Sequence, residues 1–348
     1  MIGEGILGGS MELSRIGAGT SYSVECGSSY AQTCLADLFR ARLEHAKVAI
    51  ITDREVSGYY IADFIRQFEK SGCKPVVIVI DGSQASKSFD AIRMAYERLT
   101  DMEFGPQDLL IALGGGGVID VAAFVAATYY KGIDYIQVPT SLLAMIDSSV
   151  AESAHLNFMS YKNRIGITYS PVHVLIDTDY LKTLPARYYA NGIAQVIQYG
   201  LTEEPNLLTL LEASRLSLGD LIDQCIRTRK HIHEKNPQLL TFGQEIAEAI
   251  EGHFRFLQYT HGEALALGMY AHYRSDRLHA LYTRHQLPTV VKGVTKDTLL
   301  KRIVKNFDGR SESYSVVRVS EEGKPRIEKV TSDEAYTLFD DLLRNICL

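Results

Sequence analysis

The stretch LLIALGGGGVIDVAAFVAATYYKG, residues 109–132, decides the fold of this chain. Its apolar start, residues 109–113, predicts a strand buried on both faces, as strands of parallel sheets are. Four glycines, Gly114 to Gly117, follow at once, and a helical pattern begins near Val118. Glycine lets the backbone approach an anion, and the first turn of a helix offers N–H groups. We therefore favour a phosphate-binding turn over a turn without a ligand. The run is not a GxGxxG fingerprint, so it does not by itself identify a dinucleotide.

The first half of the chain alternates short apolar runs with stretches of helical spacing. The expected strands are residues 47–52, 75–80, 109–113 and 133–138, and the expected helices between them are residues 59–71 and 88–99. Strand and helix in alternation are typical of a parallel sheet covered by helices on both faces. The sequence therefore predicts an α/β fold with a doubly wound, Rossmann-like parallel sheet.

The second half of the chain is expected to be mostly helical. The predicted helices are residues 186–200, 205–213, 217–233, 243–256, 263–281, 296–304 and 332–346, and residues 314–319 and 325–330 are expected to form a hairpin. At 348 residues the chain is long for one core, which favours two domains. We place an expression leader at residues 1–10, an α/β domain at residues 11–184 and a mainly helical domain at residues 185–348.

Composition excludes several classes of protein. The formal net charge is −6, which argues against a broad nucleic-acid surface. An odd count of 5 cysteines without a close pair is typical of a reduced cytoplasmic protein rather than a disulfide framework. We find no apolar run long enough to span a bilayer. The expected partners are therefore small molecules, not nucleic acid or membrane.

Three further motifs carry a resemblance to a known family. They are IQVPTSLLAMIDSSV at residues 136–150, VLIDTDYLKTLPARYYANGIAQVIQYGL at residues 174–201, and HGEALALGM at residues 261–269. Together with the glycine run they resemble the dehydroquinate synthase family, NAD-dependent cyclases of phosphorylated sugars. The resemblance implies an NAD-binding first domain, a second domain for substrate and metal, and a homodimer.

The resemblance also implies a set of residues around NAD. Those that match its cofactor-facing motifs are Asp53, Lys87, Gly114, Gly115, Gly116, Asp120, Thr140, Asp179, Leu181 and Thr183. Asp53 directly follows the first expected strand. Its carboxylate could accept hydrogen bonds from the ribose hydroxyls, or it could simply cap the helix that follows; both readings stay open here.

The metal-binding positions of the family are mostly changed in this chain. The family holds a divalent metal, Zn or Co, with one glutamate and two histidines, and here these positions are Gln195, Gln244 and His261. A neutral amide is a poor ligand for such a cation, so a metal is doubtful. Gln198 replaces a substrate-binding lysine of the family.

Residues for the catalytic chemistry are also implied by the resemblance. The matching catalytic positions are Asp147, Asn157, Lys162 and His261. Lys131 stands where the family usually has an arginine, and Arg310 loosely matches a lysine near the end of the family's chains.

Three functions compete at this point. The first is a dehydroquinate-synthase-like cyclase or carbon–oxygen lyase that uses NAD on a non-standard substrate, possibly a phosphorylated sugar. The second is a catalytically inactive homologue that serves as a binding or scaffold subunit, because charged residues are lost together. The third is an NAD-dependent polyol dehydrogenase, which the VPTSLLAMIDSSV and LKTLP motifs disfavour.

Overall fold

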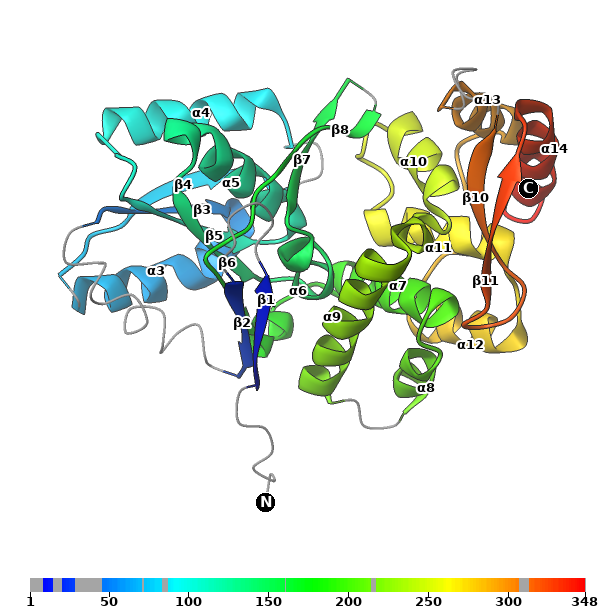
Figure 1. The fold of residues 1–348 in the computed structure, drawn as a ribbon, viewed down its shortest axis with the longest axis horizontal. Helices are drawn as coiled ribbons and strands as arrows, with labels where there is room; N and C mark the ends of the chain where they lie inside the picture. Colours follow the sequence, from blue (N-terminus) through cyan, green and yellow to red (C-terminus); the bar gives the residue numbers. More distant parts are fainter. Residues whose placement is uncertain are drawn as a thin grey trace. The chain divides into compact units, whose positions relative to one another are not determined.

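A computed structural model describes residues 9–14, 21–28, 46–70, 72–82, 87–159, 161–213, 217–306 and 313–347 (Figure 1). The chain divides into two compact units, Met1–Leu184 and Pro185–Leu348. Each is built around its own buried apolar residues. They are described separately below as unit 1 and unit 2.

Unit 1 contains a seven-stranded sheet among its described residues, with the strand order β1-β2-β9-β6-β5-β3-β4. Its strands are β1 (Gly9–Ser14), β2 (Ser21–Gly27), β3 (Val48–Asp53), β4 (Val76–Ile80), β5 (Leu109–Gly114), β6 (Asp134–Pro139) and β9 (His173–Asp177). Neighbouring strands from β2 to β4 run parallel, and β1 pairs antiparallel with β2 at one edge. The predicted α/β fold with a parallel sheet is confirmed.

Helices pack on both faces of this sheet, α4 and α5 on one face and α3 on the other (Figure 1). The helices of unit 1 are α3 (Arg54–Lys70), α4 (Phe89–Asp101), α5 (Gly116–Thr128) and the short α6 (Leu142–Ile146). Alternate residues of a strand point to opposite faces. In β5, Leu110 and Ala112 accordingly pack in the apolar cluster beneath α4 and α5. The other residues of β5 are buried as well. Burial on both faces explains the continuous apolar run in the sequence.

A hairpin that the sequence analysis did not predict covers part of α5. It consists of β7 (Ser153–Phe158) and β8 (Tyr161–Thr168), with a register irregularity between Leu156 and Phe158. Ala154 and Leu156 point into the core beside α5. The hairpin brings Asn157 and Lys162, two of the predicted catalytic residues, to the side of unit 1 that α5 occupies.

Unit 2 is mainly helical, as predicted, with one antiparallel hairpin. Its helices are α7 (Ala186–Thr202), α8 (Asn206–Glu212), α9 (Leu218–Lys235), α10 (Gln244–His253), α11 (His261–His272), α12 (Asp276–Arg284), α13 (Lys296–Asn306) and α14 (Ser332–Leu343). Helix α11 is almost wholly buried because α7 and α10 pack against it. The hairpin of β10 (Tyr314–Val319) and β11 (Pro325–Val330) has the bounds that the sequence predicted.

One expected helix differs from the structure, and part of the expected leader lies in a strand. The single helix expected over residues 263–281 is wrong, because α11 ends at His272 and Ser275 caps a new helix, its Oγ accepting the N–H of Leu278. Of the expected leader, Gly9 and Ser10 belong to β1, where they pair with Cys26 and Glu25. Residues 1–8 and Arg310 lie outside the described residues.

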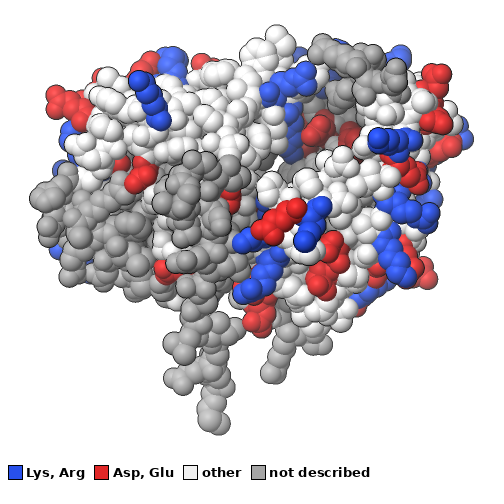
Figure 2. All heavy atoms as spheres, in the orientation of Figure 1, with Lys and Arg blue, Asp and Glu red and all other residues white. Residues whose placement is uncertain are grey.

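The surface carries both signs of charge. Figure 2 shows lysine and arginine side chains interspersed with aspartate and glutamate over the coloured part of the visible face. Within the described ranges, no helix has the length and apolar character that a membrane span requires.

Candidate functional site

The glycine turn joins β5 to α5 with very little space around it. A Cβ on Gly114 would lie 2.6 Å from Cβ of Val118, and a Cβ on Gly116 would lie 2.8 Å from Oγ of Ser148. Gly115 is the N-cap of α5, and a Cβ there would meet only Oγ of Ser141, at 3.6 Å. Packing therefore requires glycine at position 114, whereas at position 116 the Ser148 hydroxyl would have to rotate away. At Gly115 the absence of a side chain leaves the backbone N–H groups of the first helical turn open to approach.

The carboxyl ends of the parallel strands bring other predicted residues to the same edge of the sheet. Gly114 is in register with Pro139, and the N–H of Thr140 donates to the carbonyl of Gly114 at 3.0 Å. Asp53 ends β3, the strand next to β5. This edge is where α/β sheets bind their ligands.

Asp53 caps a helix. Its Oδ1 accepts the N–H of Val56 at 2.9 Å in the first turn of α3. Burial raises the pKa of Asp53 above its usual value, the N–H groups of Val56 and Glu55 oppose this shift, and the Asp81 carboxylate reinforces it. The capping role considered for Asp53 is therefore present, and it engages one of the two carboxylate oxygens.

The segment after β9 is held by its own side chains. Asp179 Oδ1 lies 2.7 Å from Nζ of Lys182 and accepts from Oγ of Ser28 at 3.2 Å. The hydroxyl of Thr183 contacts the hydroxyl of Tyr60 on α3, and the Leu181 side chain is buried. These contacts fix a short turn at the end of β9.

A buried ion pair lies beside α5. The ammonium of Lys87, 3% exposed, is 2.6 Å from Oδ2 of Asp120 and donates to Oδ1 of Asn163 at 2.7 Å. Asp120 Oδ1 also accepts the N–H of His155 at 3.1 Å. The backbone of Asn163 has φ 51°, a left-handed conformation, and its N–H donates to Oδ1 of Asn157 at 3.0 Å. We call Lys87, Asp120, His155, Asn157 and Asn163 the Lys87 cluster.

The Lys87 cluster brings together residues that were predicted to have different roles. Lys87 and Asp120 were expected at the cofactor, and Asn157 at the substrate. Burial lowers the pKa of His155, the Asp120 carboxylate opposes this shift, and the Lys87 ammonium reinforces it. Asp147 lies close enough to His155 to act on the same pKa. Lys162 lies half-buried in β8, next to Asn163.

Two buried glutamines of unit 2 form a hydrogen-bonded chain on α7. Nε2 of Gln195 donates to Oε1 of Gln198 at 2.6 Å. Nε2 of Gln198 then donates to the carbonyls of Phe242 and Leu240, at 2.7 and 3.2 Å. Phe242 lies two residues before Gln244, which begins α10. The chain of amides therefore runs from Gln195 to the backbone just before Gln244, two positions at which the resemblance places metal ligands.

His261, the third position, begins α11. Its Nδ1 is 3.3 Å from Oε2 of Glu251, a carboxylate that is 1% exposed on α10. The sequence analysis missed Glu251, although an acidic residue next to the apolar Ala249 and Ile250 was a signal. A histidine whose ring faces a buried carboxylate is held in one orientation.

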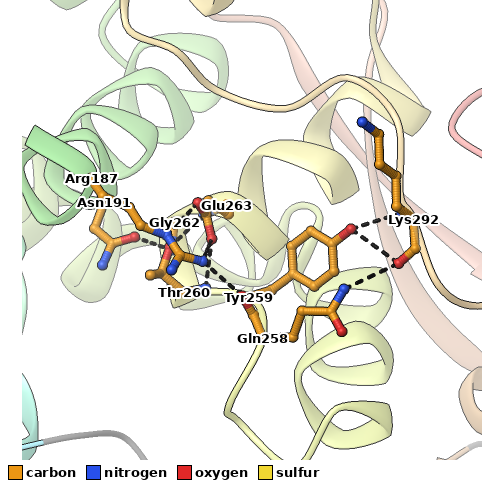
Figure 3. A network of polar contacts seen from close by, with 8 residues as sticks. All are labelled: Arg187, Asn191, Gln258, Tyr259, Thr260, Gly262, Glu263 and Lys292. Carbon is orange, nitrogen blue, oxygen red and sulfur yellow. Dashed lines mark hydrogen bonds and ion pairs between the residues drawn. The ribbon is translucent and has the colours of Figure 1, made fainter.

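Polar contacts hold the start of α11 against α7 (Figure 3). Arg187 donates to both oxygens of Glu263, each at 2.7 Å, and to the carbonyl of Gln258 at 2.7 Å. Asn191 Oδ1 accepts the N–H of Gly262 at 2.9 Å. A Cβ on Gly262 would lie 2.3 Å from Cα of Asn191, so the two helices touch there.

These contacts of Arg187 and Asn191 with the start of α11, which we call the clamp, also affect the pKa of Glu263. Burial raises its pKa, but hydrogen bonds from Arg187 and Thr260 outweigh burial and hold the pKa below the usual value. Glu263 completes a capping box with Thr260 at the N-terminus of α11. His261 lies between these two residues, so its position follows from the clamp.

The side chains present decide whether a divalent metal could bind in unit 2. The described residues contain no group of three or more His, Cys, Asp and Glu side chains that could hold a metal ion. Of the three positions at which the resemblance places metal ligands, one offers an imidazole and two offer carboxamides. This donor set does not fit Zn or Co, which are held by anionic or imidazole ligands.

Comparisons of the sequence with known proteins agree on one family. The sequence family described as 3-dehydroquinate synthase N-terminal matches residues 77–191, and 3-dehydroquinate synthase C-terminal matches residues 192–308. The 3-dehydroquinate synthase of Clostridium acetobutylicum is 31% identical over 314 residues, which cover 83% of this chain and 88% of the relative. That of Clostridium kluyveri is 29% identical over 326 residues, 87% of this chain and 91% of the relative.

Solved structures share the fold at lower identity. ValA, a 2-epi-5-epi-valiolone synthase from Streptomyces hygroscopicus subsp. jinggangensis with NAD+ and Zn2+ bound, matches with a TM-score of 0.82 and 20% identity, over 93% of this chain and 97% of that one. A 2-deoxy-scyllo-inosose synthase complexed with carbaglucose-6-phosphate, NAD+ and Co2+ matches with a TM-score of 0.78 and 22% identity, over 97% of this chain and 99% of that one.

Proposed function

The chain belongs to the 3-dehydroquinate synthase family, and from this premise we propose that it is an NAD-binding cyclase or carbon–oxygen lyase acting on a non-standard substrate. The observation that carries the proposal is the glycine turn at the N-terminus of α5. Gly114 is required by packing, and Gly115 leaves the N–H groups of the first turn open. An anionic pyrophosphate is the group that such a turn binds.

The residues of unit 1 fit NAD at the edge of the sheet. The first turn of α5 would hold the pyrophosphate, with the buried Thr140 beside it, and Asp53 would offer its remaining carboxylate oxygen to the ribose. Asp179, Leu181 and Thr183 would line the same edge after β9. Bound NAD supplies a hydride acceptor for a substrate alcohol. The Lys87 cluster would place an ammonium, two amides and an imidazole next to this edge.

Substrate chemistry is assigned to a second set of residues. Asp147, Asn157, Lys162 and His261 are proposed to contact the substrate, and a divalent metal is given no role because the donor set does not fit one. The loss of two ligands and of the lysine at position 198 favours a substrate other than that of 3-dehydroquinate synthase. Family membership also supports a homodimer, which the molar mass measured by light scattering would test.

The test begins with calorimetric titration of NAD into the purified chain. We expect saturable binding, and we expect Gly115→Ala to weaken it at least about 10-fold, because the added methyl group would stand between the N–H groups and the phosphate. The matched control is Gly105→Ala, at a loop position where a Cβ would come no closer than 3.9 Å to its nearest neighbour. Equal affinities in both variants would remove the glycine turn from the site.

Turnover separates the proposed enzyme from an inactive homologue. With NAD bound, sugar phosphates and polyols are screened for phosphate release and for NADH absorbance. We expect no phosphate release from the seven-carbon acid phosphate that 3-dehydroquinate synthases use, and turnover of at least one other compound. NAD binding without any turnover would instead favour a scaffold subunit.

A further inference from the structure

The hydrogen bonds around Gln195 and Gln198 fix which way both amides point. A backbone carbonyl can only accept, so the Gln198 atom that contacts the carbonyls of Phe242 and Leu240 has to be Nε2. The other amide atom of Gln198, Oε1, therefore faces Gln195. The Gln195 atom at 2.6 Å from it has to be a donor, which is Nε2.

We call the hydrogen-bonded pair Gln195 and Gln198 the amide relay, and its hydrogen bonds also fix where the Gln195 oxygen points. With Nε2 of Gln195 used by Gln198, its acceptor oxygen Oε1 points away from the relay. Gln195 makes no further hydrogen bond within the part of the chain that the structure describes. Gln195 is 3% exposed and Gln198 is 1% exposed. Gln195 Oε1 itself is not fully buried, so the hydroxyl group of a ligand can reach it and donate a hydrogen bond to it.

Two hydrogen bonds to α7 place the backbone near Gln244 and His261 relative to the relay. Gln198 bonds the carbonyl two residues before Gln244, and Asn191, one helical turn before Gln195, bonds the N–H that follows His261. Residues 191, 195 and 198 share one face of α7 by their spacing. The backbone beside Gln244 and the backbone beside His261 therefore both lie against this face of α7.

From these contacts we infer that Gln195 and Gln198 form an oriented amide relay that presents Gln195 Oε1 as a neutral acceptor. It binds a hydroxyl donor of an uncharged, polyol-like part of the substrate, at the place where a cation would need charged ligands. The inference rests on the proposed function, because it assigns the substrate group that unit 2 recognises. In this chain the neutral Gln195 oxygen and the His261 imidazole would contact the substrate where other family members use a metal ion.

The first experiment titrates Co2+ into the EDTA-treated full chain, followed by calorimetry and visible absorption. The wild-type chain is expected to show no saturable binding. The variant Gln195→Glu/Gln198→Lys/Gln244→His is expected to bind one Co2+, at least about 100-fold tighter, because two amides become charged or imidazole ligands. Stoichiometric Co2+ in the wild type would overturn the inference, and a folded triple variant without Co2+ would show that the positions do not converge.

A second variant covers a triple variant that fails to fold. Gln244→His alone changes a half-buried residue in the first turn of α10 and places a second imidazole near His261. Weak Co2+ binding that a further His261→Ala change abolishes would support the convergence. Binding that survives His261→Ala would contradict it.

The second experiment tests the hydroxyl donor. Saturation-transfer NMR on glycerol, sorbitol and myo-inositol is recorded with the wild-type chain and with Gln195→Leu, which has no acceptor at similar size. We expect at least one polyol to bind, with affinity lowered at least about 10-fold in the variant. No polyol signal, or a signal unchanged in Gln195→Leu, would overturn the assignment. NAD titration of the same samples separates this result from failure of the proposed function, since the glycine turn lies in unit 1.

Discussion

At the scale of single residues, the imidazole of His272 is an uncompensated buried group. Both ring nitrogens are buried without a hydrogen-bond partner among the described residues, and the rings of Phe242 and Phe339 lie against it. Burial lowers the pKa of His272 to about 3, and the charge of Arg318 reinforces the shift. The folded chain therefore keeps this imidazole neutral in mild acid.

Replacing His272 should make the protein more resistant to acid. The unfolded chain takes up a proton below its pKa near 6.5 and the folded chain does not, so stability falls as pH drops from 6.5 towards 3. His272→Phe removes this term, and its free energy of unfolding relative to the wild type should rise by about 2 kcal/mol between pH 7 and pH 5. Urea unfolding at both values measures the difference, with the exposed His279→Gln as control. A difference independent of pH would contradict the depressed pKa.

Residue types in the site could be predicted from the sequence, but their partners could not. Lys87 and Asp120 were both assigned to the cofactor, yet their own ion pair, and the bond from Lys87 to Asn163, join positions far apart in the chain. The packing of the β7–β8 hairpin on α5 brings Asn163 to this ion pair, and the N–H of Asn157 in the same hairpin donates to the carbonyl of Lys87. Glu251 and His261 are likewise joined by the contact of α10 with α11.

At the scale of elements, the glycine turn makes a prediction about stability that is independent of NAD. Gly114→Ala should destabilise the chain by about 2 kcal/mol, because its Cβ would lie 2.6 Å from the buried Val118 side chain. Gly115→Ala should cost less than about 1 kcal/mol, the size of an altered N-cap. Urea unfolding followed by circular dichroism distinguishes the two, and equal losses would show that the turn rearranges.

The clamp between α7 and α11 gives a second element-scale prediction. Arg187→Ala should lower stability by about 1 kcal/mol, a modest value because the Arg187 side chain is 53% exposed and solvent screens the pair. Arg187→Lys should recover little of it, since an ammonium cannot bond both oxygens of Glu263. Thermal unfolding measures both, and Arg227→Ala, which breaks the exposed pair with Asp223, serves as the control. Full recovery in Arg187→Lys would show that the fork geometry contributes nothing.

Helices and strands could be predicted from the sequence where the apolar periodicity and the turn or capping residues indicated the same bounds. The β10–β11 hairpin has its predicted bounds, because alternation and the intervening turn residues coincide. The break between α11 and α12 was missed because apolar spacing continued across Ser275, and the capping serine was outweighed. The β7–β8 hairpin was missed because its residues were read as a substrate motif, although β7 alternates between buried and partly exposed positions.

At the scale of the whole molecule, the two units should respond differently to NAD. Each unit is compact and has its own core, so we expect each unit of the 348-residue chain to unfold in a transition of its own, and a substitution changes the free energy of unfolding of the unit that carries it. The chain contains no tryptophan, so a single introduced tryptophan reports on its own surroundings. Phe124→Trp, on α5, reports on unit 1, and Phe254→Trp, after α10, reports on unit 2; both positions are partly buried.

A ligand that binds only folded unit 1 stabilises that unit by about 2.7 kcal/mol at 100 times its dissociation constant. In urea, saturating NAD should therefore move the fluorescence midpoint of Phe124→Trp upwards and leave that of Phe254→Trp nearly unchanged. Calorimetric binding of NAD to both variants shows that neither tryptophan disturbs the site. If the two midpoints move together, folding of unit 2 is coupled to the NAD site, and the prediction that the two units unfold independently is wrong.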